Sequence, residues 1–253
     1  MALLEVSGVD VRFGGVHALR GVDLGVEQRS VTGLIGPNGA GKTTLFNVVC
    51  GLQEPHSGTV VLDGSDIGRK KAHQRARLGI ARTFQRLEVF GSLSARANIL
   101  VAAEVRRRWA RDGSDPRAVA DEILALVGLT SVAEEQVDAM PTGLARLVEL
   151  GRALATRPRV LLLDEPSSGL DESESESFGQ LLTNLAADGL GILLVEHDID
   201  LVMAVCARIH VLDFGQILAV GTPQEIQRNE AVRAAYLGVG DEAESGIVET
   251  AAV

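Results

Sequence analysis

Apolar and polar residues alternate in short runs over the first quarter of the chain. The runs cover residues 3–6, 9–13, 22–26 and 59–62. An alternation with a period of two predicts strands that bury one face, and glycine-rich turns such as residues 14–15 separate them. We therefore expect a small antiparallel β subdomain at the N-terminus.

Predominantly apolar runs of four or five residues recur farther along the chain, and helical patterns lie between them. The runs cover residues 31–35, 160–163, 192–195 and 209–212, and the helical patterns cover 43–50, 178–187 and a stretch that begins at residue 199. Buried strands that alternate with helices are typical of a parallel sheet covered by helices. The predicted fold class is α/β with a mostly parallel sheet.

A different pattern of apolar residues interrupts the alternation of strands and helices. From about residue 92 to 150 the apolar positions follow a helical period, interrupted by a polar loop at 111–116. We interpret this block as an inserted α-helical subdomain. The predicted divisions are a β subdomain with the first part of the core (1–87), the helical subdomain (88–150), the second part of the core (151–238) and an acidic tail expected to be disordered (239–253).

Composition narrows the class of protein. The chain has 253 residues, of which 46% are hydrophobic, and a formal net charge of −10. This balance excludes a wholly disordered chain and makes nucleic acid an unexpected partner. Charged residues interrupt every long apolar stretch, so we expect no membrane-spanning helix, and the N-terminus lacks a signal-peptide pattern. Two cysteines without metal or disulfide spacing fit a reducing compartment.

The charge is distributed unevenly. Residues 66–111, which we call the basic segment, hold 12 of the 24 Lys and Arg residues but only three of the 34 acidic residues. Such a split predicts two surfaces with different partners. Solvated faces of surface helices would explain it equally well.

A glycine-rich loop follows the strand at 31–35 and fits the pattern G-x-x-x-x-G-K-[ST]. It consists of Gly36, Pro37, Asn38, Gly39, Ala40, Gly41, Lys42, Thr43 and Thr44. Backbone N–H groups of such a loop surround phosphate oxygens, and the following helix N-terminus adds positive charge. Lys42 would reach the β- and γ-phosphates, and the Thr43 hydroxyl can bind Mg²⁺. The loop predicts a P-loop NTPase core, with an ordinary glycine-rich turn as the alternative.

The apolar strand at 160–163 ends in two adjacent carboxylates, Asp164 and Glu165. Acids at the carboxyl end of a parallel strand lie where ligands bind in such folds. Asp164 would hold Mg²⁺, and Glu165 would orient or polarise the attacking water. The alternative is a pair of acids that cap the next helix.

These motifs, with three more in the same order, resemble the ATP-binding-cassette (ABC) ATPases over about residues 3–238. Thr83-Phe84-Gln85 matches the Q-loop of that family, Ser168-Gly169-Leu170-Asp171 its D-loop and Leu194-Val195-Glu196-His197-Asp198 its switch histidine. The resemblance implies that Gln85 reaches the Mg²⁺ and water site and that His197 hydrogen-bonds the γ-phosphate. It also implies that Asp171 acts across a dimer interface and that Phe13 stacks on adenine, although Phe13 could instead be a core aromatic.

One motif departs from the family. The signature loop, usually Leu-Ser-Gly-Gly-Gln, aligns with Met140-Pro141-Thr142-Gly143-Leu144. In the family this loop contacts the γ-phosphate held by the opposite subunit. Pro141 lacks both a hydroxyl and a backbone N–H, whereas Gly143 remains for a contact across the dimer. We therefore expect a heterodimer with one faster and one slower site, unless flanking N–H groups suffice.

Segments at residues 80–85, 196–203, 211–215 and 221–238 are similar to the importer ATPases of the branched-chain amino acid type. This resemblance implies ATP and Mg²⁺ as cofactors. It also implies as partners transmembrane permeases, a second ATPase and, indirectly, a solute-binding protein, and a peripheral place on the cytoplasmic face of the membrane. Paralogues for other solutes share these features, so the solute stays open.

Two other interpretations compete with an importer subunit: a soluble ABC ATPase, and a P-loop GTPase or small-molecule kinase. A soluble ABC ATPase acting on nucleic acid or ribosomes usually carries two cassettes or long coiled coils, and this chain has one cassette and no sustained heptads. A P-loop GTPase would need an Asn-Lys-x-Asp motif, which none of the three lysines provides. A small-molecule kinase would not need the D-loop.

Overall fold

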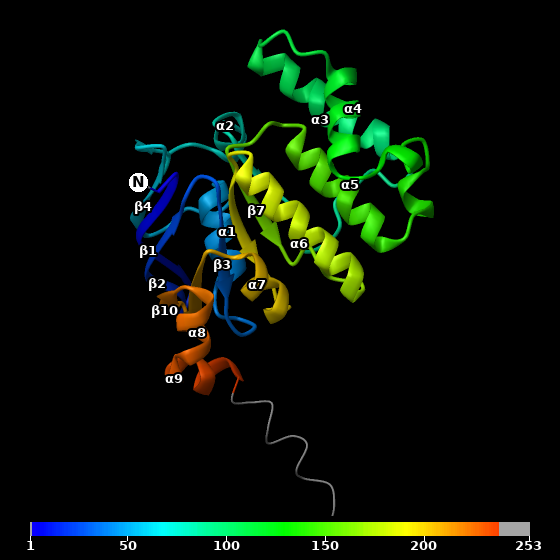
Figure 1. Ribbon diagram of the computed structural model, residues 1–253. Helices are drawn as coiled ribbons and strands as arrows, with labels where there is room; N and C mark the ends of the chain where they lie inside the picture. The colour runs from blue at the N-terminus through cyan, green and yellow to red at the C-terminus, as the bar shows by residue number, and fades with distance from the viewer. Residues whose placement is uncertain (1, 238–253) are drawn as a thin grey trace, which may run out of the picture.

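The computed structural model describes residues 2–237, and within them the chain forms two β-sheets (Figure 1). The smaller sheet is antiparallel, with the order β2-β1-β4-β5. Its strands are β1 (Leu4–Phe13), β2 (Val16–Val26), β4 (Ser57–Leu62) and β5 (Ser65–Asp66). The antiparallel β subdomain predicted from the alternating runs is confirmed.

The larger sheet has the order β10-β9-β3-β8-β7-β6 within the described residues. Its strands are β3 (Ser30–Ile35), β6 (Ile80–Arg82), β7 (Val160–Asp164), β8 (Gly191–Val195), β9 (Arg208–Asp213) and β10 (Gln216–Gly221). Neighbours from β9 to β6 pair in parallel, and β10 runs antiparallel to β9 at the edge. Strands β3 and β7 lie on either side of β8 and run parallel to it. The loops that follow β3 and β7 therefore lie at the same edge of the sheet.

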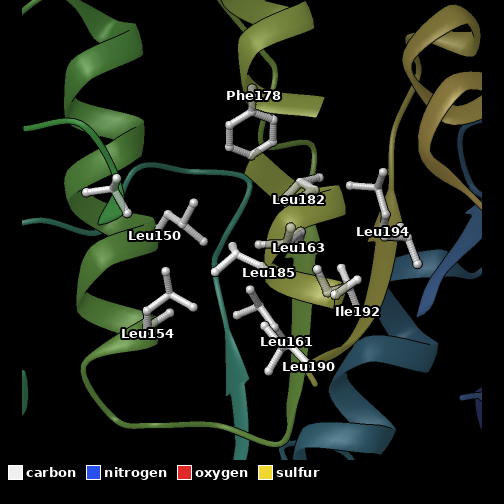
Figure 2. Packing of buried hydrophobic residues seen from close by; sticks show 14 of the residues in the cluster. Leu150, Leu154, Leu161, Leu163, Phe178, Leu182, Leu185, Leu190, Ile192 and Leu194 are labelled. Carbon is white, nitrogen blue, oxygen red and sulfur yellow. The ribbon is translucent and has the colours of Figure 1, made fainter. Parts of the chain in front are cut away.

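Helices cover both faces of this sheet. On one face, α1 (Lys42–Cys50) buries Leu45, Phe46, Val48 and Val49. On the other, leucines of α5 (Thr142–Leu154) and α6 (Glu172–Ala187) pack against Leu161 and Leu163 of β7 and Ile192 and Leu194 of β8, as Figure 2 shows. Each buried side chain of this size contributes about 1.5–3 kcal/mol. Outside the helical subdomain, the described residues also form the helices α2 (Ala72–Arg77), α7 (Ile199–Val205), α8 (Pro223–Arg228) and α9 (Glu230–Val232).

The helical subdomain contains α3 (Ala95–Ala110), α4 (Pro116–Leu126) and α5. Ser94 caps α3, and Asp115 caps α4 with Pro116 in its first turn, so the polar loop predicted at 111–116 also starts the next helix. The division between residues 150 and 151 falls inside α5, which carries the subdomain directly into the core.

Helix α6 begins six residues before the predicted position at 178. Asp171 and Glu174 form a reciprocal capping box that starts it at Glu172. The Glu–Ser run at 172–177 has no apolar period, which explains why the pattern missed it. Among the described helices, none has the length and hydropathy needed to cross a membrane. The tail expected at 239–253 lies outside the described residues.

Candidate active site

The glycine-rich loop joins β3 to α1. A Cβ on Gly36 would lie 2.0 Å from the Leu212 carbonyl oxygen, and one on Gly41 would lie 2.7 Å from the Ala18 carbonyl oxygen. Gly41 also has φ +113°, a conformation that other residues rarely adopt. The loop therefore fits between β2 and β9 only with glycine at these two positions.

Lys42 begins α1, and its side chain turns back over the loop. Its Nζ donates to the carbonyl oxygens of Gly36 at 2.5 Å and Pro37 at 3.2 Å. Burial lowers the pKa of Lys42, while the nearby carboxylates of Glu165 and Asp164 oppose that shift. The ammonium thus lies between the loop and the two acids that end β7.

An open cleft of about 430 Å³ runs along this loop. It is lined by Gly15, Val16, His17, Ala18, Arg20, residues 38–44, Gln85, Glu165, Phe214 and Gly215. The cleft thus joins most of the glycine-rich loop to two of the predicted catalytic residues. Phe13 does not line it, but Phe13 pairs with Val16, which does, and Phe13 is half exposed.

Three side chains predicted separately meet at Glu165. Gln85 Nε2 donates to Glu165 Oε2 at 3.1 Å, and His197 Nε2 lies 3.1 Å from Glu165 Oε1. Glu165 has φ +50°, and its N–H donates to the Val195 carbonyl oxygen, which turns the chain sharply at the end of β7. A carboxylate held on both oxygens has a defined orientation toward the cleft.

His197 is itself held by its neighbour Glu196. The buried Glu196 carboxylate accepts hydrogen bonds from the backbone N–H groups of Ser167 at 2.7 Å and His197 at 3.1 Å. Burial raises the pKa of Glu196, and these hydrogen bonds oppose the shift. Glu196 therefore ties the segment after β7 to the segment after β8.

Asp164 forms a buried ion pair that the sequence reasoning missed. Arg82 Nη2 lies 2.8 Å from Asp164 Oδ2, and Arg82 Nη1 donates to Asn47 Oδ1 at 2.6 Å. The guanidinium lies 5.4 Å from the Phe46 ring centroid and 4.8 Å from that of Phe84. Arg82 ends β6, the parallel neighbour of β7, so the two opposite charges lie at the same edge of the sheet.

Helix α5 holds the segment that carries Gln85. The buried Glu149 carboxylate accepts hydrogen bonds from the N–H groups of Phe84 at 3.3 Å and Glu88 at 3.2 Å. Arg146 donates to the carbonyl oxygens of Phe84 at 3.1 Å and Gln85 at 2.8 Å. The helix behind the signature loop is thereby bonded to the backbone on both sides of Gln85.

Gly143 of the signature loop and Asp171 of the D-loop, the two residues expected to act across a dimer, lie in loops that contact each other. Gly143 is buried, and a Cβ there would lie 2.9 Å from the Leu170 side chain. Asp171 is exposed and caps α6 through the N–H of Glu174. The signature loop and the D-loop therefore pack together within one chain.

The candidate ligands for Mg²⁺ are oxygen atoms of Thr43, Gln85 and Asp164. Thr43 and Gln85 line the cleft, and Asp164 precedes Glu165. Residues 2–237 contain no cluster of three or more His, Cys, Asp or Glu side chains suited to a metal. One carboxylate with hydroxyl and amide oxygens fits Mg²⁺, which is usually bound together with substrate phosphates and water.

Comparison with known proteins shows which family this chain resembles. The family described as ABC transporter matches residues 19–168, and that described as branched-chain amino acid ATP-binding cassette transporter matches residues 216–242. The chain is 39% identical over 249 residues to the high-affinity branched-chain amino acid transport ATP-binding protein BraF of Pseudomonas aeruginosa, covering 93% of this chain and 98% of that protein. It is 33% identical over 238 residues to the lipopolysaccharide export system ATP-binding protein LptB of Haemophilus influenzae, covering 94% and 98%.

Solved structures agree with the fold. MJ1267, an ATP-binding cassette of an ABC transporter, matches with a TM-score of 0.84 at 28% identity, covering 93% of this chain and 99% of that one. The ADP conformation of MJ1267 matches with a TM-score of 0.82 at 27% identity, covering 94% and 99%.

Proposed function

Because the chain belongs to the ABC transporter family, as an ATP-binding subunit, we propose that it hydrolyses ATP to drive the uptake of a branched-chain or related amino acid. BraF, named for branched-chain amino acid transport, matches nearly the whole chain, and the match over residues 216–242 points to the same branch. The single observation that carries the hydrolytic role is the position of Glu165, held by Gln85 and His197 at the cleft.

Each residue of the site has a distinct task in this proposal. Backbone N–H groups of residues 38–44 bind the phosphates, and Lys42 leaves its two carbonyl partners to contact the β- and γ-phosphates. Glu165 orients the attacking water and accepts its proton. His197 and Gln85 hold that carboxylate, and His197 donates to the charge that develops on the γ-phosphate.

Thr43, Gln85 and Asp164 would hold Mg²⁺. When bound, the ion neutralises charge on the β- and γ-phosphate oxygens. Asp164 is paired with Arg82, which holds this carboxylate in place at the end of β7.

This chain has a groove behind Gln85 that suits a permease partner. A groove of about 530 Å³ lies between α2, β6, α3 and α5, and its lining includes the exposed side chains of Phe84, Phe90 and Val105. We assign it to an apolar segment of the permease. A segment bound there would lie against the backbone that Glu149 and Arg146 attach to Gln85.

Only some of the basic side chains of the basic segment are exposed at the surface. Arg75 is buried and donates to the carbonyl oxygens of Val48 and Val49, and Arg82 is the buried partner of Asp164. Exposed basic residues remain on α2, on α3 and in the loops beside the groove, and they would face acidic permease loops or anionic headgroups on the cytoplasmic side of the membrane. They are Arg69, Lys70, Lys71, Arg77, Arg86, Arg107, Arg108 and Arg111.

The central experiment compares Glu165→Gln with the wild-type chain. The amide keeps the size of the side chain but cannot accept a proton, so hydrolysis should fall by orders of magnitude while ATP binding persists. Reconstitution with the cognate permeases and the solute-binding protein, with ATPase activity measured against a panel of amino acids, tests the transported class. Full hydrolysis by Glu165→Gln would overturn the hydrolytic assignment. A complex that no amino acid stimulates would overturn the solute class.

A further inference from the structure

One aromatic residue beside the cleft occupies a position that its own turn disfavours. Phe214 and Gly215 form the two-residue loop between β9 and β10, with φ of +42° and +78°. Positive φ at both positions defines a type I′ turn, which prefers Asn, Asp or Gly at the first position. Phenylalanine there is strained by its Cβ, so the turn itself does not explain this residue.

Burial does not explain it either. The Phe214 side chain is 79% exposed, the largest value among the exposed large apolar residues within the described part of the chain. Val16, which also lines the cleft, is 67% exposed. Two apolar side chains thus flank the cleft without packing into the core.

The turn is fixed to the phosphate-binding loop. The Gly215 N–H donates to the Ala40 carbonyl oxygen at 2.9 Å, and its own carbonyl oxygen accepts from the Arg20 N–H at 2.8 Å. A Cβ on Gly215 would lie 2.6 Å from the Ala18 carbonyl oxygen. Phe214 is therefore held at a set position relative to both the loop and β2.

We propose that Phe214 contacts the purine base of the bound nucleotide and contributes to its affinity. This inference rests on the proposed function. In the proposed function Lys42, Gln85 and Glu165 mark the phosphate end of the cleft. The lining outside the glycine-rich loop and these residues comes from residues 15–18, Arg20 and the turn of Phe214 and Gly215. Phe214 is the aromatic side chain among them. A flat aromatic ring is attracted to the face of a base, and this contact is independent of the phosphates.

The test is Phe214→Asn in the full chain, measured by calorimetric binding of ATP and of inorganic tripolyphosphate, with thermal unfolding in parallel. Asparagine suits the type I′ turn, so the unfolding temperature should rise while ATP binds about tenfold more weakly, the size of one lost base–aromatic stack. Tripolyphosphate, which has no base, should bind as it does to the wild type. Phe214→Trp should restore ATP affinity.

Leu218→Asn is the matched control, because Leu218 is exposed on the same hairpin but does not line the cleft. It should leave ATP affinity unchanged. Unchanged ATP affinity in Phe214→Asn, or an equal loss for ATP and tripolyphosphate, would overturn the role of Phe214 alone. A wild-type chain that binds no ATP would overturn the proposed function instead.

Discussion

His197 Nε2 lies 3.1 Å from Oε1 of Glu165, although the two residues are 32 positions apart in the chain. They follow β7 and β8, which are parallel neighbours, so the sheet itself brings the imidazole and the carboxylate together. The contact orients the residue that we assign to the attacking water.

His197→Ala should lower kcat for ATP hydrolysis by about 100-fold, the usual effect of removing one positioned hydrogen-bond donor from a transition state. KM for ATP should change little, because the phosphates are bound by the glycine-rich loop. Steady-state phosphate release measures both constants. His56→Ala, which removes a histidine that lies outside the cleft lining, serves as the control. A variant with normal kcat would remove His197 from the mechanism.

The ion pair between Arg82 and Asp164 leads to a prediction about stability. The two side chains are 7% and 3% exposed, so Arg82→Met would leave a buried carboxylate without its charged partner. The free energy of unfolding in urea should fall by about 3 kcal/mol. Arg96→Met removes a partly exposed arginine paired with the exposed acids Asp121 and Glu134, and it should cost less than about 1 kcal/mol per pair. Equal effects would show that the Arg82 pair contributes nothing beyond a surface contact.

Local patterns predicted most of the fold. The strands, the glycine-rich loop and the acids that end β7 are each encoded within about ten neighbouring residues, where periodicity and spacing are visible. The start of α6 was missed because its first turn is specified by the capping pair Asp171 and Glu174 rather than by apolar residues.

The contacts that support the site could not be predicted in this way. Arg82 meets Asp164 across 82 positions, and Glu149 meets the Phe84 N–H across 65. Such pairs depend on which strands and helices become neighbours, a result of tertiary packing. From the sequence, Arg82 belonged to a basic segment, and only the sheet order shows that it faces the end of β7.

Buried His210 predicts how stability depends on pH. It lies on β9, is 5% exposed, and neither ring nitrogen has a hydrogen-bond partner among the described residues. Burial, aided by the positive charge of Arg208, lowers the pKa of His210 from 6.5 to about 4. The folded state therefore disfavours the proton that the unfolded chain accepts below about pH 6.5, so stability is complete above that pH and is lost as the pH falls toward 4.

Between pH 7.5 and 5.0, His210 alone should lower the free energy of unfolding by about 2 kcal/mol. His210→Phe should remove this part of the pH dependence, which urea unfolding at the two pH values measures. His73→Phe, at an exposed position, is the matched control and should keep the wild-type dependence. An identical pH dependence in wild type and His210→Phe would mean that other groups cause it.

Substitution of Pro141 tests whether the signature loop, which differs here from the usual family sequence, makes the two sites of a dimer unequal. It stands at the N-cap of α5, is exposed, and offers the helix no side-chain hydrogen bond. Pro141→Ser would restore a hydroxyl and a backbone N–H, the two donors that the loop otherwise lacks at this position. Because a serine N-cap also stabilises a helix by about 1 kcal/mol, rates must be compared well below the unfolding temperature.

We expect Pro141→Ser to raise ATP hydrolysis by the purified chain alone several-fold, because each site in a homodimer is closed by this loop. In a heterodimer whose partner carries an intact signature loop, the site on Lys42 and Glu165 should hydrolyse ATP at the same rate with either residue. Only the partner's own site, which Pro141 closes, should become faster. Single-turnover measurements with Glu165→Gln in this chain isolate that second site. Full-rate hydrolysis by the wild-type homodimer, unchanged by Pro141→Ser, would contradict the asymmetry.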